Sequence, residues 1–153
     1  MITREADYSI RAILYLSQPD RTGNIVPVKE LAEATDIPYR FLRKIMLGLV
    51  NNGFVTSVRG RSGGFRLARK AKRISLLDVL RATDPRGVTL NRCLREGETC
   101  SQVEHCPVHV QLANLQKRLD TCLGAITFAE LHDSATTAAK ECKECKECSA
   151  AAP

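Results

Sequence analysis

Residues 28–68 read VKELAEATDIPYRFLRKIMLGLVNNGFVTSVRGRSGGFRLA. Apolar residues recur at helical spacing in the first part of this stretch, which predicts a short helix over residues 28–35 and a second from Pro38 to about Asn52. Asp36-Ile37-Pro38 breaks the first helix, and Pro38 suits the first turn of the second. The second helix is predicted to turn these residues inward: Phe41, Leu42, Ile45, Met46 and Leu49.

The rest of the stretch predicts a hairpin. Gly53 suits the position just past a helix end. Residues 54–58 and 65–68 have the composition of strands, and Gly63-Gly64 between them can form a turn. Two short helices, a tight break and a two-stranded hairpin together describe a winged helix-turn-helix.

Helical spacing also appears on both sides of this unit. Residues 3–17 predict a leading helix, and Ser75 is placed to cap a helix that ends at Thr83-Asp84-Pro85. From Pro107 a near-heptad apolar stripe predicts a long helix that pairs with its copy in a homodimer, although packing back on the same chain is the alternative. The stripe consists of Val108, Leu112, Leu115 and Leu119. Thr127 is predicted to cap a last helix through Leu131.

The fold class is therefore mainly α, a winged helix-turn-helix DNA-binding domain followed by a long dimerisation helix. We divide the chain into four parts. They are the DNA-binding domain (1–84), a cysteine-containing loop (85–106), the dimerisation and C-terminal helices (107–139), and a flexible tail (140–153) in which Lys-Glu-Cys is repeated.

The charge of the chain is unevenly distributed. The net charge is +6 over 153 residues. Residues 1–84 hold 15 Lys and Arg against 8 Asp and Glu, a net of +7, and residues 85–153 hold 8 against 9, a net of −1. This imbalance predicts a polyanionic partner for the first half.

With 44% hydrophobic residues, the chain can form a core, but no apolar run approaches the length of about 20 residues that spans a bilayer. The start of the chain lacks a signal-peptide pattern, so we expect a cytoplasmic protein that does not enter a membrane.

Basic residues gather where a winged helix meets double-stranded DNA. The second helix exposes Tyr39, Arg40, Arg43 and Lys44, which alone could equally be an ordinary solvated face. Residues 59–73 strengthen the DNA interpretation, because they contain seven cations and no acidic residue. Contact with phosphates relieves the repulsion among such cations, and Arg59 and Arg61 at the hairpin tip could enter a minor groove.

Three cysteines follow the basic segment in the pattern C-x6-C-x5-C. They are Cys93, Cys100 and Cys106, and His109 follows three residues after the last of them. In a reducing cytosol such cysteines indicate zinc, an iron–sulfur cluster or a thiol switch more than disulfides. Cys122 is predicted to lie in the core and His105 to face solvent. No catalytic constellation is present, so we expect a non-enzyme, and the basic segment disfavours a small redox or metal-carrier protein.

The chain resembles the IscR/NsrR family of bacterial iron–sulfur transcription regulators over roughly residues 1–135. The resemblance is carried by Thr3–Ala12, Ile37–Ile45, Val58–Phe65 and Ile74–Leu80, with the three cysteines following. It implies a homodimeric winged-helix regulator, most simply a repressor, that binds an operator in double-stranded DNA.

The resemblance also implies an iron–sulfur cluster on Cys93, Cys100 and Cys106. His109 matches the fourth ligand of IscR-like proteins, which implies a 2Fe–2S cluster. Asp7 matches the partner-subunit ligand of NsrR-like proteins, which implies a nitric-oxide-reactive 4Fe–4S cluster. Both residues are present, so the ligand set stays open. The chain departs from IscR at Arg43, where IscR has an acidic residue, and in a first cysteine gap that is one residue longer.

Overall fold

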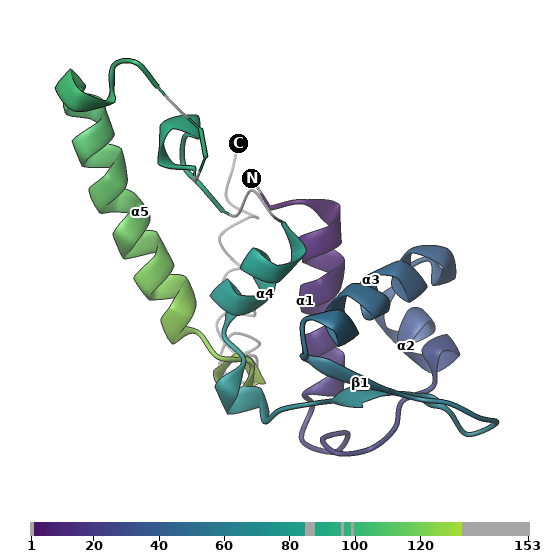
Figure 1. The fold of residues 1–153 in the computed structure, drawn as a ribbon. Coiled ribbons are helices and arrows are strands. Elements are labelled where there is room, and N and C mark those ends of the chain that lie inside the picture. The colour runs from purple at the N-terminus through teal and green to yellow at the C-terminus, as the bar shows by residue number, and fades with distance from the viewer. Residues whose placement is uncertain (1, 85–87, 96, 99, 133–153) are drawn as a thin grey trace, which may run out of the picture.

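The computed structural model describes residues 2–84, 88–95, 97–98 and 100–132. Within them the chain is mainly helical with one two-stranded sheet, as Figure 1 shows, so the predicted winged helix-turn-helix is confirmed. The elements are α1 (Arg4–Leu16), α2 (Val28–Thr35), α3 (Tyr39–Asn51), β1 (Val55–Val58), β2 (Gly64–Leu67), α4 (Leu76–Thr83) and α5 (Pro107–Ala125), with short 3-10 turns η1 (Ala71–Arg73), η2 (Arg92–Leu94) and η3 (Val103–His105).

The core lies between the first four helices. Thr3 begins α1 by accepting a hydrogen bond from the Ala6 backbone N–H at 3.2 Å. The buried faces of the helices meet in one cluster of aliphatic side chains, which includes Ile13, Leu31, Leu42, Met46 and Ile74. Each of these side chains is fully buried, so burial of apolar surface orients α3 relative to α1 and α2.

The turn between α2 and α3 is made by Asp36. This residue adopts φ +54°, and its N–H bonds the Ala32 carbonyl oxygen. Aspartate tolerates the left-handed region better than most residues with a side chain. Ile37 follows and is buried, while Pro38 stands just before α3 as its N-cap. Pro38 therefore lies one position earlier than the sequence predicted.

The hairpin contains a third segment that the sequence pattern did not predict. Strands β1 and β2 pair antiparallel with Val55 opposite Leu67 and Val58 opposite Gly64. Val26 pairs with Phe65 on the other side, with N–O distances of 2.8 and 2.9 Å. A Cβ on Gly64 would lie 2.1 Å from the Val26 carbonyl oxygen, so this position requires glycine.

The turn of the hairpin spans residues 59–63 and not Gly63-Gly64 as predicted. Gly60 has φ +115°, and its carbonyl oxygen accepts the Gly63 N–H at 3.0 Å. Gly64 already belongs to β2. The turn forms earlier because Gly60 supplies the positive φ and Gly64 is held against Val26.

Phe41 is not part of the core, contrary to the sequence prediction. Its side chain is 60% exposed, whereas Leu42 and Ile45 beside it are buried. Phe41 lies at the edge of the apolar face of α3, over a groove that is also lined by Tyr8 and Lys44. The groove stays open because the first turn of α1 there carries the charged residues Arg4 and Glu5.

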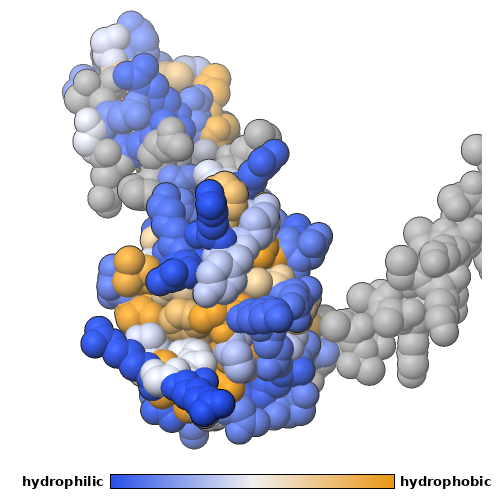
Figure 2. Space-filling model, turned by 90° about the vertical axis from the view of Figure 1, so that its right-hand side faces the viewer, coloured by the Kyte–Doolittle hydropathy of each residue, from blue (hydrophilic) through white to orange (hydrophobic). Residues whose placement is uncertain are grey.

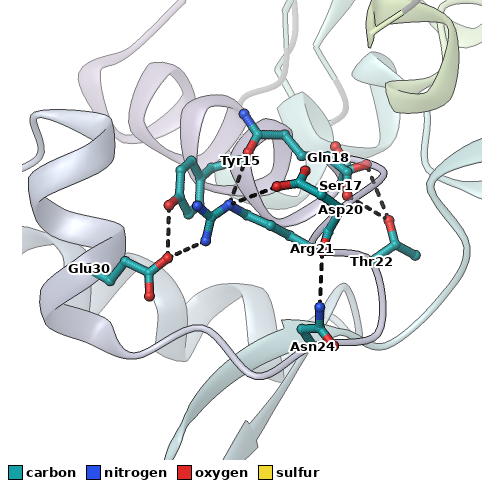
Figure 3. Close-up of polar contacts among 8 residues, drawn as sticks. All are labelled: Tyr15, Ser17, Gln18, Asp20, Arg21, Thr22, Asn24 and Glu30. Atoms are coloured by element: carbon teal, nitrogen blue, oxygen red, sulfur yellow. Dashed lines mark hydrogen bonds and ion pairs between the residues drawn. The ribbon is translucent and has the colours of Figure 1, made fainter.

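A polar cluster joins the end of α1 to α2. The Tyr15 hydroxyl donates to Glu30 Oε1 at 3.0 Å, and the Arg21 guanidinium pairs with the same carboxylate. The Arg21 guanidinium also lies 4.4 Å from the centroid of the Tyr15 ring. Figure 3 shows these residues together. Burial raises the pKa of Tyr15, and its hydrogen bond to Glu30 raises it further. The cluster holds α2 in place relative to α1.

The long helix α5 lies on the far side of α1 and α4 from the hairpin, as Figure 1 shows. The predicted cap of α4 is confirmed, because the Ser75 hydroxyl accepts the Asp78 N–H while the Asp78 carboxylate accepts the Ser75 N–H. Helix α4 is joined to α5 by an ion pair between Arg81 and Asp120 at 2.9 Å. No helix among the described residues is both long and apolar enough to cross a membrane.

After α5 the chain returns to the first core. The Leu76 N–H bonds the Ile126 carbonyl oxygen, and the Phe128 N–H bonds the Ile74 carbonyl oxygen at 3.0 Å. Phe128 is fully buried in the same cluster as Ile13. The predicted cap at Thr127 is confirmed: residues 128–132 are helical, and Thr127 exchanges hydrogen bonds with Glu130. The hydrogen bonds that the Glu130 carboxylate accepts from the Thr127 backbone N–H and hydroxyl lower its pKa. The Lys-Glu-Cys tail predicted to be flexible lies outside the described residues.

Phe128→Ala tests whether α5 is anchored through this ring. We expect the free energy of unfolding to fall by about 3–5 kcal/mol, because the variant leaves a cavity in a close-packed core. Urea denaturation followed by circular dichroism at fixed protein concentration measures the change. Phe41→Ala is the matched control and should cost less than about 1 kcal/mol, because that ring is mostly exposed. Equal losses in the two variants would contradict the anchoring role.

Candidate nucleic-acid interface and metal centre

Helix α3 presents the predicted basic side chains to solvent. Arg40, Arg43 and Lys44 are exposed, and Tyr39 is 49% exposed. Lys44 lies 3.9 Å from the Glu5 carboxylate, a distant and solvated pair. The first turn of α3 contains no acidic residue, and Pro38 provides no side-chain cap. Both features favour an anion near this helix end.

Leu47 lies on the same face and was not singled out from the sequence. Arg40, Arg43, Lys44 and Leu47 are spaced at i, i+3, i+4 and i+7, so their side chains share one side of the helix. Leu47 is 61% exposed. The helical spacing from Arg43 was the signal that could have identified it.

The hairpin extends the basic surface. Arg59 and Arg61 are exposed in the turn, on either side of Gly60. Figure 2 views the side of the molecule formed by α2, α3 and the hairpin, where hydrophobic surface lies exposed between strongly hydrophilic side chains. Such a mixture of charged and apolar surface suits the phosphates and the base edges of a duplex.

Arg69 binds other residues of the fold, unlike the other cations of residues 59–73. Its Nε donates to the Gly53 carbonyl oxygen and its NH2 to that of Asn52, each at 3.0 Å. Its guanidinium also lies 4.5 Å from the centroid of the Phe54 ring. Arg69 therefore caps the C-terminal end of α3, where carbonyl oxygens lack helical partners. No sequence signal indicated this role, because the contact joins residues sixteen positions apart.

Six cations of the segment 59–73 have no such partner. Among the described residues, no carboxylate lies within ion-pair distance of any of them. They are Arg59, Arg61, Arg66, Lys70, Lys72 and Arg73. The sequence predicts seven uncompensated cations in this segment. The structure leaves six, because Arg69 binds backbone carbonyl oxygens within the fold.

The predicted metal ligands come together only in part. Cys93 lies in η2, and its Sγ is 3.4 Å from Nδ1 of His109 in the first turn of α5. Cys106 is half-buried as the N-cap of α5, and Cys100 is exposed. These thiols are free, and among the described residues no three His, Cys, Asp or Glu side chains converge as a metal site.

Polar contacts fasten the cysteine loop to α5. Gln116 on α5 donates to the Val88 carbonyl oxygen at 2.8 Å and accepts the Leu90 N–H at 2.9 Å. Within the loop Arg92 and Arg95 both pair with Glu98. The hydrogen bond from Arg92, followed by that from Arg95, lowers the pKa of Glu98. Gln116 therefore holds the segment just before Cys93 against α5.

The remaining candidate residues lie apart from this pair. Asp7 forms an ion pair with Arg11 at 2.8 Å within α1. His105 is exposed, as predicted. Cys122 is also exposed, so its predicted place in the core is wrong for the single chain. Helix α5 packs on α4 through a different side, the one that carries Gln116 and Asp120.

The apolar stripe of α5 is only partly covered in the single chain. Val108 and Leu115 are 59% and 51% exposed, and Leu112 and Leu119 are half-buried. Val110, about 200° around the helix from Val108, is also 55% exposed. Exposed apolar surface of this kind is typical of a helix that associates with another chain. The homodimer stays a prediction.

The fold and its basic surface define a winged helix-turn-helix DNA-binding protein. Residues 2–134 match the model of the Rrf2 family, described as an iron-dependent transcriptional regulator. The IscR transcriptional regulator of Xenorhabdus nematophila is 32% identical over 130 residues, covering 85% of this chain and 77% of that protein. The chain belongs to the Rrf2 family of transcriptional regulators.

Solved structures share the fold. IscR of T. potens superposes with a TM-score of 0.65 at 24% identity and covers 88% of each chain. CymR (YrzC), the global cysteine regulator of B. subtilis, superposes with a TM-score of 0.64 at 19% identity, covering 88% of this chain and 97% of that one. The winged-helix arrangement is therefore common to proteins whose sequences differ widely.

Arg69→Ala separates the structural cation from those available to DNA. We expect it to lower the free energy of unfolding by about 1–2 kcal/mol, because two backbone hydrogen bonds and the stacking on Phe54 are lost. Arg66→Ala is the matched control and should leave stability nearly unchanged, since Arg66 is exposed on β2. Thermal unfolding of both variants makes the comparison, and a larger loss for Arg66→Ala would refute the assignment.

Proposed function

We propose that the protein is an iron–sulfur-dependent repressor that binds an operator in double-stranded DNA as a homodimer. The DNA would be contacted by Tyr39, Arg40, Arg43 and Lys44 of α3 and by Arg59 and Arg61 of the hairpin. Cys93, Cys100 and Cys106 would hold the cluster with His109. The proposal is supported most directly by the 3.4 Å contact between Cys93 and His109.

The donor set suits an iron–sulfur cluster. Cysteine thiolates are the usual ligands of such clusters, and imidazole replaces thiolate in some. Cys93 and His109 are half-buried and Cys100 is exposed, so the donors are accessible for assembly. When bound, a cluster would supply a centre that responds to redox stress, iron–sulfur supply or nitric oxide. A thiol switch or a zinc site on the same three cysteines is the alternative, and metal analysis distinguishes them.

The choice of His109 over Asp7 rests on their neighbours. His109 lies against the first cysteine in the same chain, whereas Asp7 is engaged by Arg11. The Cys93–His109 pair therefore supports the proposal of a 2Fe–2S cluster. Asp7 would have to leave its ion pair to serve the partner subunit, although an exposed pair of this kind costs little to break.

The proposed coupling runs along α5. Its N-terminal end begins at Cys106, and the chain after its C-terminal end enters the core through Phe128. A cluster gained, lost or nitrosylated would favour one position of the loop and of α5 over another. In a dimer built on the α5 stripe, such a shift would change the separation of the two α3 helices against half-sites about 34–36 Å apart.

Ligand substitutions test the cluster. Full-length protein purified without oxygen should contain iron and sulfide and show the absorption and EPR spectra of a cluster. Ala at Cys93, Cys100 or Cys106 should remove it, and His109→Ala should remove or destabilise it. Asp7→Asn should leave it intact if the 2Fe–2S assignment holds.

Cys122→Ala is the matched control, because Cys122 is exposed on α5 away from the loop. It should retain the full iron and sulfide content. A colourless wild-type protein that contains only zinc would contradict the cluster, and loss of the cluster in Asp7→Asn but not in His109→Ala would reverse the choice of ligand.

The double variant Arg59→Ala and Arg61→Ala tests the hairpin. Duplex affinity should fall, and the slope of log affinity against log salt should become shallower by about two for each bound protomer, because two phosphate contacts are lost. Lys117→Ala with Arg118→Ala is the control, since it removes the same charge from exposed positions on α5. The assignment fails if both double variants change the salt slope equally.

A further inference from the structure

The base-facing side of α3 contains one apolar side chain among its cations. Arg40, Arg43 and Lys44 are exposed, and Leu47 completes the face one turn beyond Arg43. The opposite side of the helix is buried, with Leu42, Ile45, Met46 and Leu49 between 0% and 5% exposed. Leu47, at 61% exposed, therefore contributes little to the core.

A single exposed leucine is ordinary on a protein surface. Two features distinguish Leu47. Its neighbours on the same face are cations that are complementary to a polyanion, so this surface approaches DNA. In addition, Gly48 follows it, and a Cβ at Gly48 would meet no atom within 4 Å. The helix surface beside Leu47 is thus bare, which leaves room for close approach of a duplex.

We propose that Leu47 is a specificity-determining residue that contacts the C5-methyl group of a thymine in the major groove. This inference rests on the proposed DNA-binding function and refines it. In the major groove the thymine methyl is the apolar group by which the four standard bases differ, whereas arginine matches the paired acceptors of guanine. The spacing i, i+3, i+4, i+7 is also the one by which homeodomain recognition helices contact bases.

The geometry specifies where the thymine should lie. Leu47 is four residues beyond Arg43, which is about 6 Å along a helix. A step of that length corresponds to about two base pairs along a duplex. The operator half-site should therefore contain a thymine about two base pairs from the base that Arg43 contacts.

The test replaces thymine by deoxyuridine, which lacks only the methyl group. Preferred duplexes are first selected from a random pool by the full-length protein purified without oxygen. Each thymine of the selected half-site is then changed to deoxyuridine, and affinity is measured at constant salt by fluorescence anisotropy. We expect one position at which wild-type affinity falls about fourfold, or about fifteenfold when both half-sites are changed.

Leu47→Ala should bind the thymine and deoxyuridine duplexes equally at that position, while Leu47→Met should keep the preference. Phe41→Ala is the matched control: its side chain is exposed to the same degree on the same helix but lies at the groove beside Tyr8. It should discriminate as the wild type does.

The outcomes separate this inference from the proposed function. A wild type that selects a duplex but is indifferent to every deoxyuridine overturns the role of Leu47 and leaves DNA binding intact. The role is also overturned if Leu47→Ala retains the preference, or if it changes the oligomeric state. A wild type that selects no duplex overturns both.

Discussion

The burial of Phe128 joins the two halves of this protein. Its ring belongs to the same core cluster as Ile13 and Ile74, so the segment that follows α5 shares one apolar interior with the winged helix-turn-helix. Backbone hydrogen bonds between residues 126–128 and residues 74–76 reinforce the connection. Helix α5 is about 28 Å long for its 19 residues. Its other end begins at Cys106, so the cysteine loop and Phe128 lie at opposite ends of this helix.

The distribution of arginine partners separates the cations that stabilise the fold from those of the proposed DNA-binding surface. Arg21 pairs with Glu30, Arg81 with Asp120, and Arg69 with the carbonyl oxygens that end α3. These contacts hold elements together. The cations that remain without such partners are concentrated in the hairpin and on the exposed side of α3. Because they are poorly compensated inside the chain, a phosphate backbone is their natural partner. In the proposed interface Leu47 would add recognition of thymine to the recognition of guanine by arginine, since phosphate contacts carry no sequence information.

Local signals explain why so much of the fold could be predicted. The helices α1 to α5 follow apolar spacing, and Ser75 with Asp78 forms the predicted capping box. Predictions failed where a contact between distant segments decided the outcome. Phe41 has the composition of a core position, yet the charged first turn of α1 leaves it exposed. Cys122 was assigned to the core, yet α5 packs on α4 through another side. Val26 completes the hairpin from a loop, and nothing in its neighbourhood indicated a strand partner.

The candidate site likewise combines features that local sequence determines with features that depend on contacts between distant segments. The amino-acid sequence alone determined the basic composition of residues 59–73, the spacing of Cys93, Cys100 and Cys106, and the helical period that aligns Arg40 with Arg43. These follow from residue type and local geometry, which need no partner. Only the tertiary structure decided that Arg69 caps α3, that His109 lies against Cys93, and that Phe128 returns to the core. Each of these contacts joins residues at least sixteen positions apart, and the burial and packing that select such contacts arise only when the whole chain folds.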